Sequence, residues 1–143
     1  MSVLVLDASV AAKWFLPAKG ETLTEQALSL FRQYAHGEVR FVVPDLFWAE
    51  LGNLFWKAVC QGRWSRASAE AAIAELQERR LPTITTAALL DLAFRIATAF
   101  GRTVYDSLYV ALAVYSKGQL VTADERLANA LAAELPVKWL GAV

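Results

Sequence analysis

The sequence contains few of the residues on which many enzyme active sites depend. Its 143 residues include one cysteine (Cys60) and one histidine (His36), and fourteen Lys and Arg residues balance fourteen Asp and Glu residues. One cysteine excludes an intramolecular disulfide, and one histidine with one cysteine argues against a zinc site of nitrogen and sulfur ligands. Because the net charge is zero, any contact with nucleic acid must be local.

Several sequence signatures are also missing. The seven glycines are dispersed and form neither of the common phosphate-binding loops, and the G-x-S-x-G motif of serine hydrolases is absent. No uncharged apolar run reaches the roughly 18 residues of a membrane span. The early run VLVL is interrupted by Asp7 and Lys13, which argues against a signal peptide. We therefore expect one soluble, cytoplasmic domain over residues 1–143, without a membrane segment.

Apolar residues make up 57% of the chain. They occur either in short runs or at helical spacing, and the two patterns alternate along the sequence. Short apolar runs predict strands at residues 3–6, 40–43, 81–85, 119–122 and 137–140. Helical periodicity and stop signals predict helices at residues 8–15, 21–36, 45–61, 66–80, 87–99, 104–116 and 123–134. This alternation with short connections predicts an α/β fold with a mostly parallel central sheet flanked by helices. The helix 45–61 is apolar nearly all round, so it must be covered on more than one side.

Four carboxylates stand in apolar sequence, unlike the other acidic residues: Asp7 in VLVLDAS, Glu50 in FWAELGNLFW, Asp106 in TVYDSLYVALAV and Asp124 in QLVTADERLA. Removing a carboxylate from water is costly unless something compensates its charge. Asp7 and Asp124 follow predicted strands and Asp106 begins a helix, so we expect them to meet at the carboxyl edge of the sheet. Carboxylates that meet repel one another unless a divalent cation is bound, and their oxygens suit Mg²⁺ or Mn²⁺.

Each acid taken alone also has a structural interpretation. Asp7 can cap the helix that follows it. Asp106 and Asp124 can belong to helix starts with capping boxes. One box pairs Thr103 with Asp106, and the other pairs Thr122 with Glu125, which places Asp124 at the second helical position. Glu50 lies in mid-helix between aromatic residues and has the weakest structural explanation. The set of four, rather than any single member, indicates a metal site.

Four ordered segments resemble the PIN-domain ribonucleases, and among these the VapC toxins of prokaryotic type II toxin–antitoxin modules: VLDASVAAKWFLP, PDLFWAELGNLFWKAV, TVYDSLYVALAV and QLVTADERLA. The resemblance implies a PIN-like three-layer α/β sandwich and an endoribonuclease dependent on Mg²⁺ or Mn²⁺. It also implies cleavage by water that leaves a 5′-phosphate, inhibition of translation and growth, a homodimer and a cognate antitoxin.

The resemblance implies a role for individual residues as well. It assigns metal binding to four residues and supporting roles to two: Asp7, Glu50, Asp106 and Asp124 as ligands, Ser9 in ordering the site and Thr122 in supporting the final Asp. A different class of function remains open, namely a non-catalytic binding or scaffolding domain with the same fold. A metal-dependent phosphatase is a further alternative, because D-A-S after a strand is similar to a haloacid-dehalogenase motif, although that motif requires a second Asp where this chain has Ser9.

Basic and aromatic residues near the motifs have two interpretations each. Lys13 and Arg102 are candidates for contact with an RNA phosphate, or else they are solvated surface charges. Trp14 and Tyr105 are candidates for stacking on bases, although core packing is the expected role for aromatics in such apolar runs.

Overall fold

Five short strands form the centre of the molecule. The computed structural model describes residues 1–143, and its strands are β1 (Ser2–Leu6), β2 (Val39–Pro44), β3 (Thr83–Ile84), β4 (Gln119–Thr122) and β5 (Val137–Trp139). Every neighbouring pair is parallel, and the order across the sheet is β3-β2-β1-β4-β5. The inner strands are buried on both faces over most of their length, which is why they appear in the sequence as short apolar runs.

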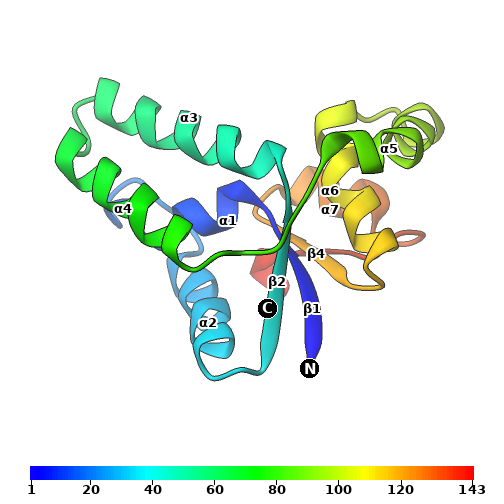
Figure 1. Ribbon diagram of the computed structural model, residues 1–143, viewed down its shortest axis with the longest axis horizontal. Helices are drawn as coiled ribbons and strands as arrows, with labels where there is room; N and C mark the ends of the chain where they lie inside the picture. Colours follow the sequence, from blue (N-terminus) through cyan, green and yellow to red (C-terminus); the bar gives the residue numbers. More distant parts are fainter.

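Helices cover the sheet in two layers, so the predicted three-layer α/β sandwich is confirmed (Figure 1). The helices are α1 (Ala8–Ala12), α2 (Thr24–Ala35), α3 (Leu46–Cys60), α4 (Arg66–Glu78), α5 (Thr86–Phe100), α6 (Val104–Tyr115) and α7 (Glu125–Leu131), with a 3₁₀ turn at Leu140–Ala142. Helices α1 to α4 lie on the left of Figure 1, and α5 to α7 lie on the right. No helix combines the length and the apolar character needed to cross a membrane.

Two helix starts differ from the prediction by more than one residue. Helix α2 begins at Thr24 rather than at residue 21, because Leu23 adopts a left-handed conformation with φ of 58°. Glu21 is thereby left in a loop, where it pairs with two basic side chains instead of lying on a helix surface. Helix α7 begins at Glu125 rather than at residue 123, since the capping residue is Asp124.

Helix α3 is covered on more than one side, as predicted. It packs against both α1 and α4, and Phe47, Leu51 and Phe55 are almost fully buried. Trp56 is its main exposed apolar side chain, at 63%. Other large apolar side chains are exposed on the opposite layer, at Leu90 and Phe94 of α5 and Tyr105 of α6. The excess apolar surface therefore lies mainly on α5 and α6.

The strand order reverses between β1 and β4. From β1 the chain continues to β2 and β3 on one side, whereas β4 and β5 occupy the other side. In an open parallel sheet the connections diverge at such a switch point and leave a crevice at the carboxyl ends of the two strands. Asp7 follows β1 and Asp124 lies two residues after β4, so both lie at this crevice.

Candidate metal centre

Asp7 combines a structural role with a place in the candidate site. It caps α1, since its Oδ1 accepts a hydrogen bond from the Ser9 backbone N–H at 3.1 Å. Its Oδ2 accepts a second hydrogen bond, at 2.7 Å, from the hydroxyl of Thr122 at the end of β4. The capping interpretation is therefore confirmed, and the second oxygen joins the two strands at the switch point.

Thr122 connects Asp7 to Asp124. Its side chain is fully buried, and its hydroxyl oxygen accepts a hydrogen bond from the Asp124 backbone N–H at 3.0 Å. Asp124 caps α7 by accepting from the Leu127 N–H at 3.1 Å. The predicted capping box from Thr122 to Glu125 is wrong, because Thr122 belongs to the strand and donates toward Asp7 instead. For the box from Thr103, the cap itself is confirmed, since the Thr103 hydroxyl accepts from the Asp106 N–H at 3.1 Å.

Glu50 is held by a residue that the sequence analysis missed. The hydroxyl of Tyr109, in α6, donates to Glu50 Oε1, in α3, over 2.5 Å, and only 4% of Tyr109 is exposed. Tyr109 lies three residues after Asp106, so both side chains project from neighbouring turns of one helix face. The available signal was a hydroxyl in the otherwise aliphatic run YVALAV, although nothing in the sequence identified its partner.

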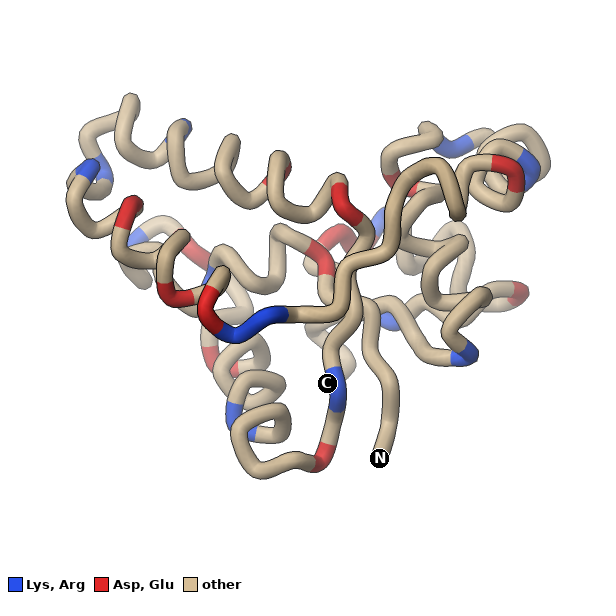
Figure 2. Tube along the Cα trace, viewed as in Figure 1, with Lys and Arg blue, Asp and Glu red and all other residues tan.

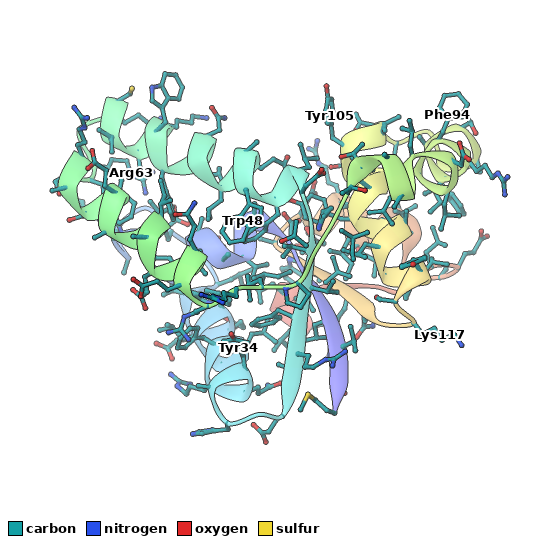
Figure 3. All side chains as sticks on the ribbon, in the orientation of Figure 1. Tyr34, Trp48, Arg63, Phe94, Tyr105 and Lys117 are labelled. Atoms are coloured by element: carbon teal, nitrogen blue, oxygen red, sulfur yellow. The ribbon has the colours of Figure 1, made fainter.

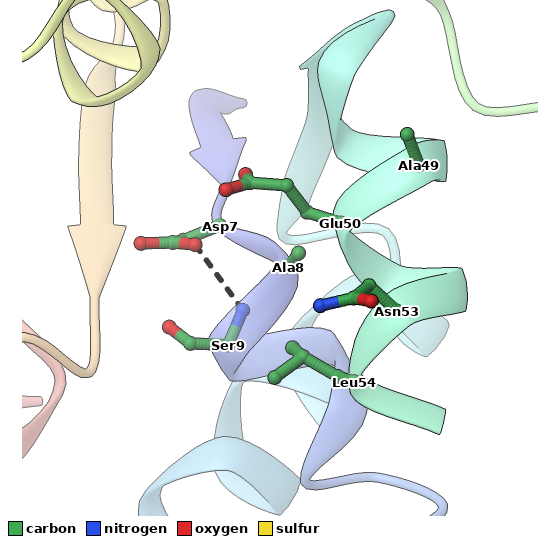
Figure 4. Close-up of a pocket in the computed structure, with 7 residues that line it drawn as sticks. All are labelled: Asp7, Ala8, Ser9, Ala49, Glu50, Asn53 and Leu54. Carbon is green, nitrogen blue, oxygen red and sulfur yellow. Dashed lines mark hydrogen bonds between the residues drawn. The ribbon is translucent and has the colours of Figure 1, made fainter. Parts of the chain in front are cut away.

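Asp7 and Glu50 line one pocket of about 330 Å³ (Figure 4). Figure 4 shows both carboxylates turned toward the same end of the pocket, with Ser9 beside Asp7 and Asn53 on the α3 wall. Asn53 is a second polar residue to which the sequence analysis assigned no role. The Ser9 hydroxyl is buried and has no hydrogen-bond partner. A buried hydroxyl without a partner is costly, so this end of the pocket suits a polar ligand.

The four carboxylates influence one another through space. Burial raises the pKa of Asp7, and the charge of Asp106 raises it further, against the hydrogen bonds from Thr122 and Ser9. Burial and the charges of Asp7 and Asp106 likewise raise the pKa of Glu50. Burial and the charge of Asp124 raise the pKa of Asp106. Figure 2 shows acidic segments near one another where the two helical layers meet.

No basic side chain forms an ion pair with this cluster. All five ion pairs in the structure involve other acidic residues. Asp106 and Asp124 do not line the pocket, and no three carboxylates are grouped closely enough to hold a single ion. The hard oxygen donors, their mutual repulsion and the unpartnered Ser9 hydroxyl fit a divalent cation.

The two candidate basic residues lie in different surroundings. Lys13 is only 9% exposed and its Nζ lies 3.2 Å from Glu21, so it is not a solvated surface charge. Arg102 is half-buried and donates to the backbone carbonyl of Arg126 at 3.0 Å. Its charge lowers the pKa of Asp106, opposing the larger effect of burial.

The two aromatic candidates, Trp14 and Tyr105, differ in how exposed they are. Trp14 is partly buried and packs against the core, with its indole N–H donating to the Ala27 carbonyl at 2.8 Å and its ring packed against Phe31. Tyr105 is 64% exposed, so the expectation of core packing is wrong for this residue. It occupies the second position of α6, where the helix surface faces solvent.

Comparisons with known proteins identify the family. Residues 4–131 match the family model described as the PIN domain. Ribonuclease VapC3 of Pyrobaculum aerophilum is 35% identical over 128 residues, which cover 88% of this chain and 92% of that protein.

Solved structures share the fold. PAE2754 from Pyrobaculum aerophilum matches with a TM-score of 0.69 and 23% identity, covering 99% of this chain and 85% of that chain. VapBC2 from Rickettsia felis, bound to a DNA fragment from its promoter, matches with a TM-score of 0.58 and 14% identity, covering 96% and 98%. A toxin–antitoxin complex from Klebsiella pneumoniae matches with a TM-score of 0.59 and 13% identity, covering 94% and 95%. The family match over most of the chain confirms the motif resemblance, and the chain belongs to the PIN domain family, with VapC-type similarity.

Proposed function

We propose that this protein is a divalent-metal-dependent endoribonuclease and the toxin of a toxin–antitoxin pair. The observation that carries the proposal is a set of four carboxylates, from four parts of the chain, that raise one another's pKa and form no ion pair with a basic side chain. Similarity to a relative named a ribonuclease supports RNA as the substrate. Similarity to toxin–antitoxin complexes supports an antitoxin partner.

Each part of the site has a role in this proposal. Asp7, Glu50, Asp106 and Asp124 would hold Mg²⁺ or Mn²⁺, while Thr122 and Tyr109 keep Asp7 and Glu50 in position. A bound divalent ion supplies a water of lowered pKa and neutralises charge on the phosphoryl oxygens. In the hydrolysis the water oxygen bonds to phosphorus and the bond to the 3′-oxygen breaks, which leaves a 5′-phosphate and a 3′-hydroxyl.

The cellular role follows from the activity. Cleavage of cellular RNA would inhibit translation and growth, and the cytoplasm is where such RNA is accessible. Arg102, beside Asp106, would contact a phosphate of the bound strand. The exposed apolar side chains Leu90 and Phe94 of α5 would bury their surface in a homodimer.

A non-catalytic binding domain of the same fold is the main alternative. Such a domain gains nothing from repelling carboxylates, because their repulsion destabilises the folded chain. A phosphatase is disfavoured by Ser9, which stands where the phosphatase motif requires a second Asp.

Incubation of the purified protein with RNA and Mg²⁺ or Mn²⁺ tests the proposal. Asp106→Asn should lower the cleavage rate at least about 100-fold while the chain stays folded, since it removes a ligand of the bound ion. Asp7→Asn should do the same, although it also perturbs the cap of α1. Asp91→Asn, at an exposed position of α5, is the matched control and should cleave normally.

Two readouts decide the outcome. Sequencing of the product ends should show 5′-phosphates, and EDTA should abolish cleavage. Cleavage that persists in EDTA, or products ending in a 2′,3′-cyclic phosphate, would contradict the proposed chemistry.

A further inference from the structure

A second pocket adjoins the candidate metal centre and carries the opposite charge. It has a volume of about 300 Å³ and shares Ser9 and Leu54 with the first pocket. Both charged residues of the first pocket are acidic. The charged residues of the second pocket are three bases and one acid, namely Lys13, Lys57, Arg63 and Glu21. An RNA strand that extends from the carboxylates past Leu54 would therefore meet a surplus of positive charge.

Glu21 organises the basic residues of this pocket. Its Oε1 lies 3.2 Å from Lys13 Nζ, and its Oε2 lies 3.2 Å from Arg63 Nη2. The exposed fraction of the side chain is 9% for Lys13, 15% for Glu21 and 35% for Arg63. Lys13 and Glu21 thus form an inner wall that is neutral as a pair. The surplus charge belongs to Arg63 and to Lys57, which is exposed and forms no ion pair.

Arg63 is held in place by the loop that contains Gly20 and Glu21. It lies at the turn that joins α3 to α4, as Figure 3 shows, and one of its nitrogens binds Glu21. Gly20, which precedes Glu21 in the chain, also lies close to the guanidinium, since a Cβ added there would lie 3.4 Å from Arg63 Nη2. Gly20 also has a φ of +88°, which other residues rarely adopt. A guanidinium has five N–H donors, so Arg63 keeps donors for a further anion after binding Glu21.

We propose that this second pocket is a subsite for a backbone phosphate of the RNA strand, adjacent to the phosphate at the carboxylate cluster; the inference rests on the proposed function. The protein has no net positive charge, so a polyanion must be attracted by a local group of bases. Guanidinium and ammonium groups with free donors are the usual partners of phosphate oxygens. Phosphate contacts set the position of a strand without reading its sequence. Arg63 and Lys57 would thus place the scissile bond over Asp7 and Glu50.

Binding measurements with the Arg63→Gln variant test the subsite. Both parent and variant carry Asp106→Asn, so that the RNA stays intact, and a labelled oligoribonucleotide is titrated in Mg²⁺ at several salt concentrations by fluorescence anisotropy. Loss of one charged contact should weaken binding about tenfold. In a plot of the logarithm of the association constant against the logarithm of the salt concentration, the slope should become less steep by about 0.7. This is the value for one phosphate contact with a single strand.

Two further variants make the result specific. Lys57→Gln should act in the same direction, and it breaks no ion pair, so it tests the subsite even if Arg63→Gln destabilises the fold. Lys117→Gln removes the same charge at the opposite end of the molecule from Arg63 (Figure 3). It should leave affinity and slope within about twofold of the parent, since distant exposed charges are screened by salt.

The outcomes separate the subsite from the proposed activity. Equal affinities and salt slopes for Arg63→Gln, Lys57→Gln and Lys117→Gln would overturn the subsite. If Arg63→Gln and Lys57→Gln bind RNA as the parent does but no longer bind an oligoglutamate peptide that the parent binds, the pocket would be a site for an acidic protein segment. That outcome would also overturn the RNA subsite. If a chain with Asp106 intact cleaves no RNA but Arg63→Gln weakens RNA binding as expected, the proposed function fails and the subsite is supported.

Discussion

At the scale of single residues, Asp7 shows how one carboxylate serves both stability and function. One oxygen caps α1 and the other accepts the hydroxyl of Thr122. A carboxylate has about four acceptor positions, so these two bonds leave capacity for a cation. The same bonds restrict rotation of the side chain, which keeps its remaining lone pairs at the mouth of the pocket.

Tyr109→Phe should weaken metal binding without unfolding the protein. The change removes the hydrogen bond to Glu50 but keeps the buried ring. Partners behind a metal ligand typically contribute 10-fold to 100-fold to affinity, so the Mn²⁺ concentration at half-maximal thermal stabilisation should rise about tenfold. Tyr115→Phe, at an exposed position of the same helix, is the control. An unchanged Mn²⁺ titration would show that Tyr109 does not position Glu50 for the metal.

The stability of the metal-free protein should depend on pH through Asp106. Burial and Asp124 raise the pKa of Asp106, so the folded state holds its proton more tightly than the unfolded state. The resulting stability is present below the ordinary pKa and is lost as the pH rises through the raised pKa. Asp106→Asn carries no charge at any pH, so in EDTA at pH 7 its Tm should exceed that of the wild type by about 2 °C.

Thermal unfolding at two pH values checks this sign. The difference in Tm between Asp106→Asn and the wild type should shrink near pH 4, where the wild-type Asp106 carboxyl becomes protonated and uncharged. Asp91→Asn should produce no such difference, because Asp91 is exposed and forms no ion pair. A lower Tm for Asp106→Asn at pH 7 in EDTA would mean that the cluster is not repulsive.

At the scale of elements, one acidic side chain joins three segments. Glu21 lies in the loop before α2, Lys13 caps the end of α1, and Arg63 lies between α3 and α4. This contact exists because Leu23 turns the chain before α2 can begin. The loop therefore connects the end of α1 to the α3–α4 pair.

Glu21→Gln should destabilise the fold far more than Glu25→Gln. The first change leaves the buried Lys13 ammonium without its partner, which we expect to cost about 2 kcal/mol. Glu25 is 83% exposed and lies 3.9 Å from Arg32, so its loss should cost less than about 0.5 kcal/mol. Both variants remove one negative charge, and urea unfolding compares them directly. Equal midpoints would show that Glu21 contributes no more than a surface ion pair.

At the scale of the whole molecule, the two faces of the sandwich differ in what they expose. The layer of α1 to α4 carries the two pockets described above and all five ion pairs. The layer of α5 and α6 exposes Leu90, Phe94 and Tyr105, and Figure 3 shows the last two on the outer side of these helices. Exposed apolar side chains of this size are typical of surfaces that another chain covers.

Phe94→Ser should dissociate the homodimer that we propose. The wild type should sediment as a dimer at tens of micromolar, and loss of a half-exposed aromatic ring from the interface should raise the dissociation constant at least about tenfold. Trp56→Ser removes a similarly exposed ring from α3 and serves as the comparison. Dissociation by Trp56→Ser but not by Phe94→Ser would place the interface on α3, and a monomeric wild type would contradict the dimer itself.

The sequence by itself determined the order of the elements and the identity of the unusual acids. Strands covered on both faces are mostly apolar, so β1, β2 and β4 were visible as short apolar runs such as VLVL. Asp7, Glu50, Asp106 and Asp124 stood out because a charge in apolar sequence requires compensation. Their order and spacing were sufficient to indicate the PIN family, which the comparisons confirm.

Only the tertiary structure decided which side chains meet. Tyr109 lies 59 residues from Glu50, and Thr122 lies 115 residues from Asp7. Helical periodicity indicates which face of a helix is apolar, but it does not say whether another element covers that face. Tyr105 illustrates this, because it lies in an apolar run and is nevertheless exposed. The opposing residue depends on how the connections cross the sheet, and here the reversal between β1 and β4 brings distant residues together. For the same reason the basic pocket around Arg63 was not visible in a sequence whose charges sum to zero.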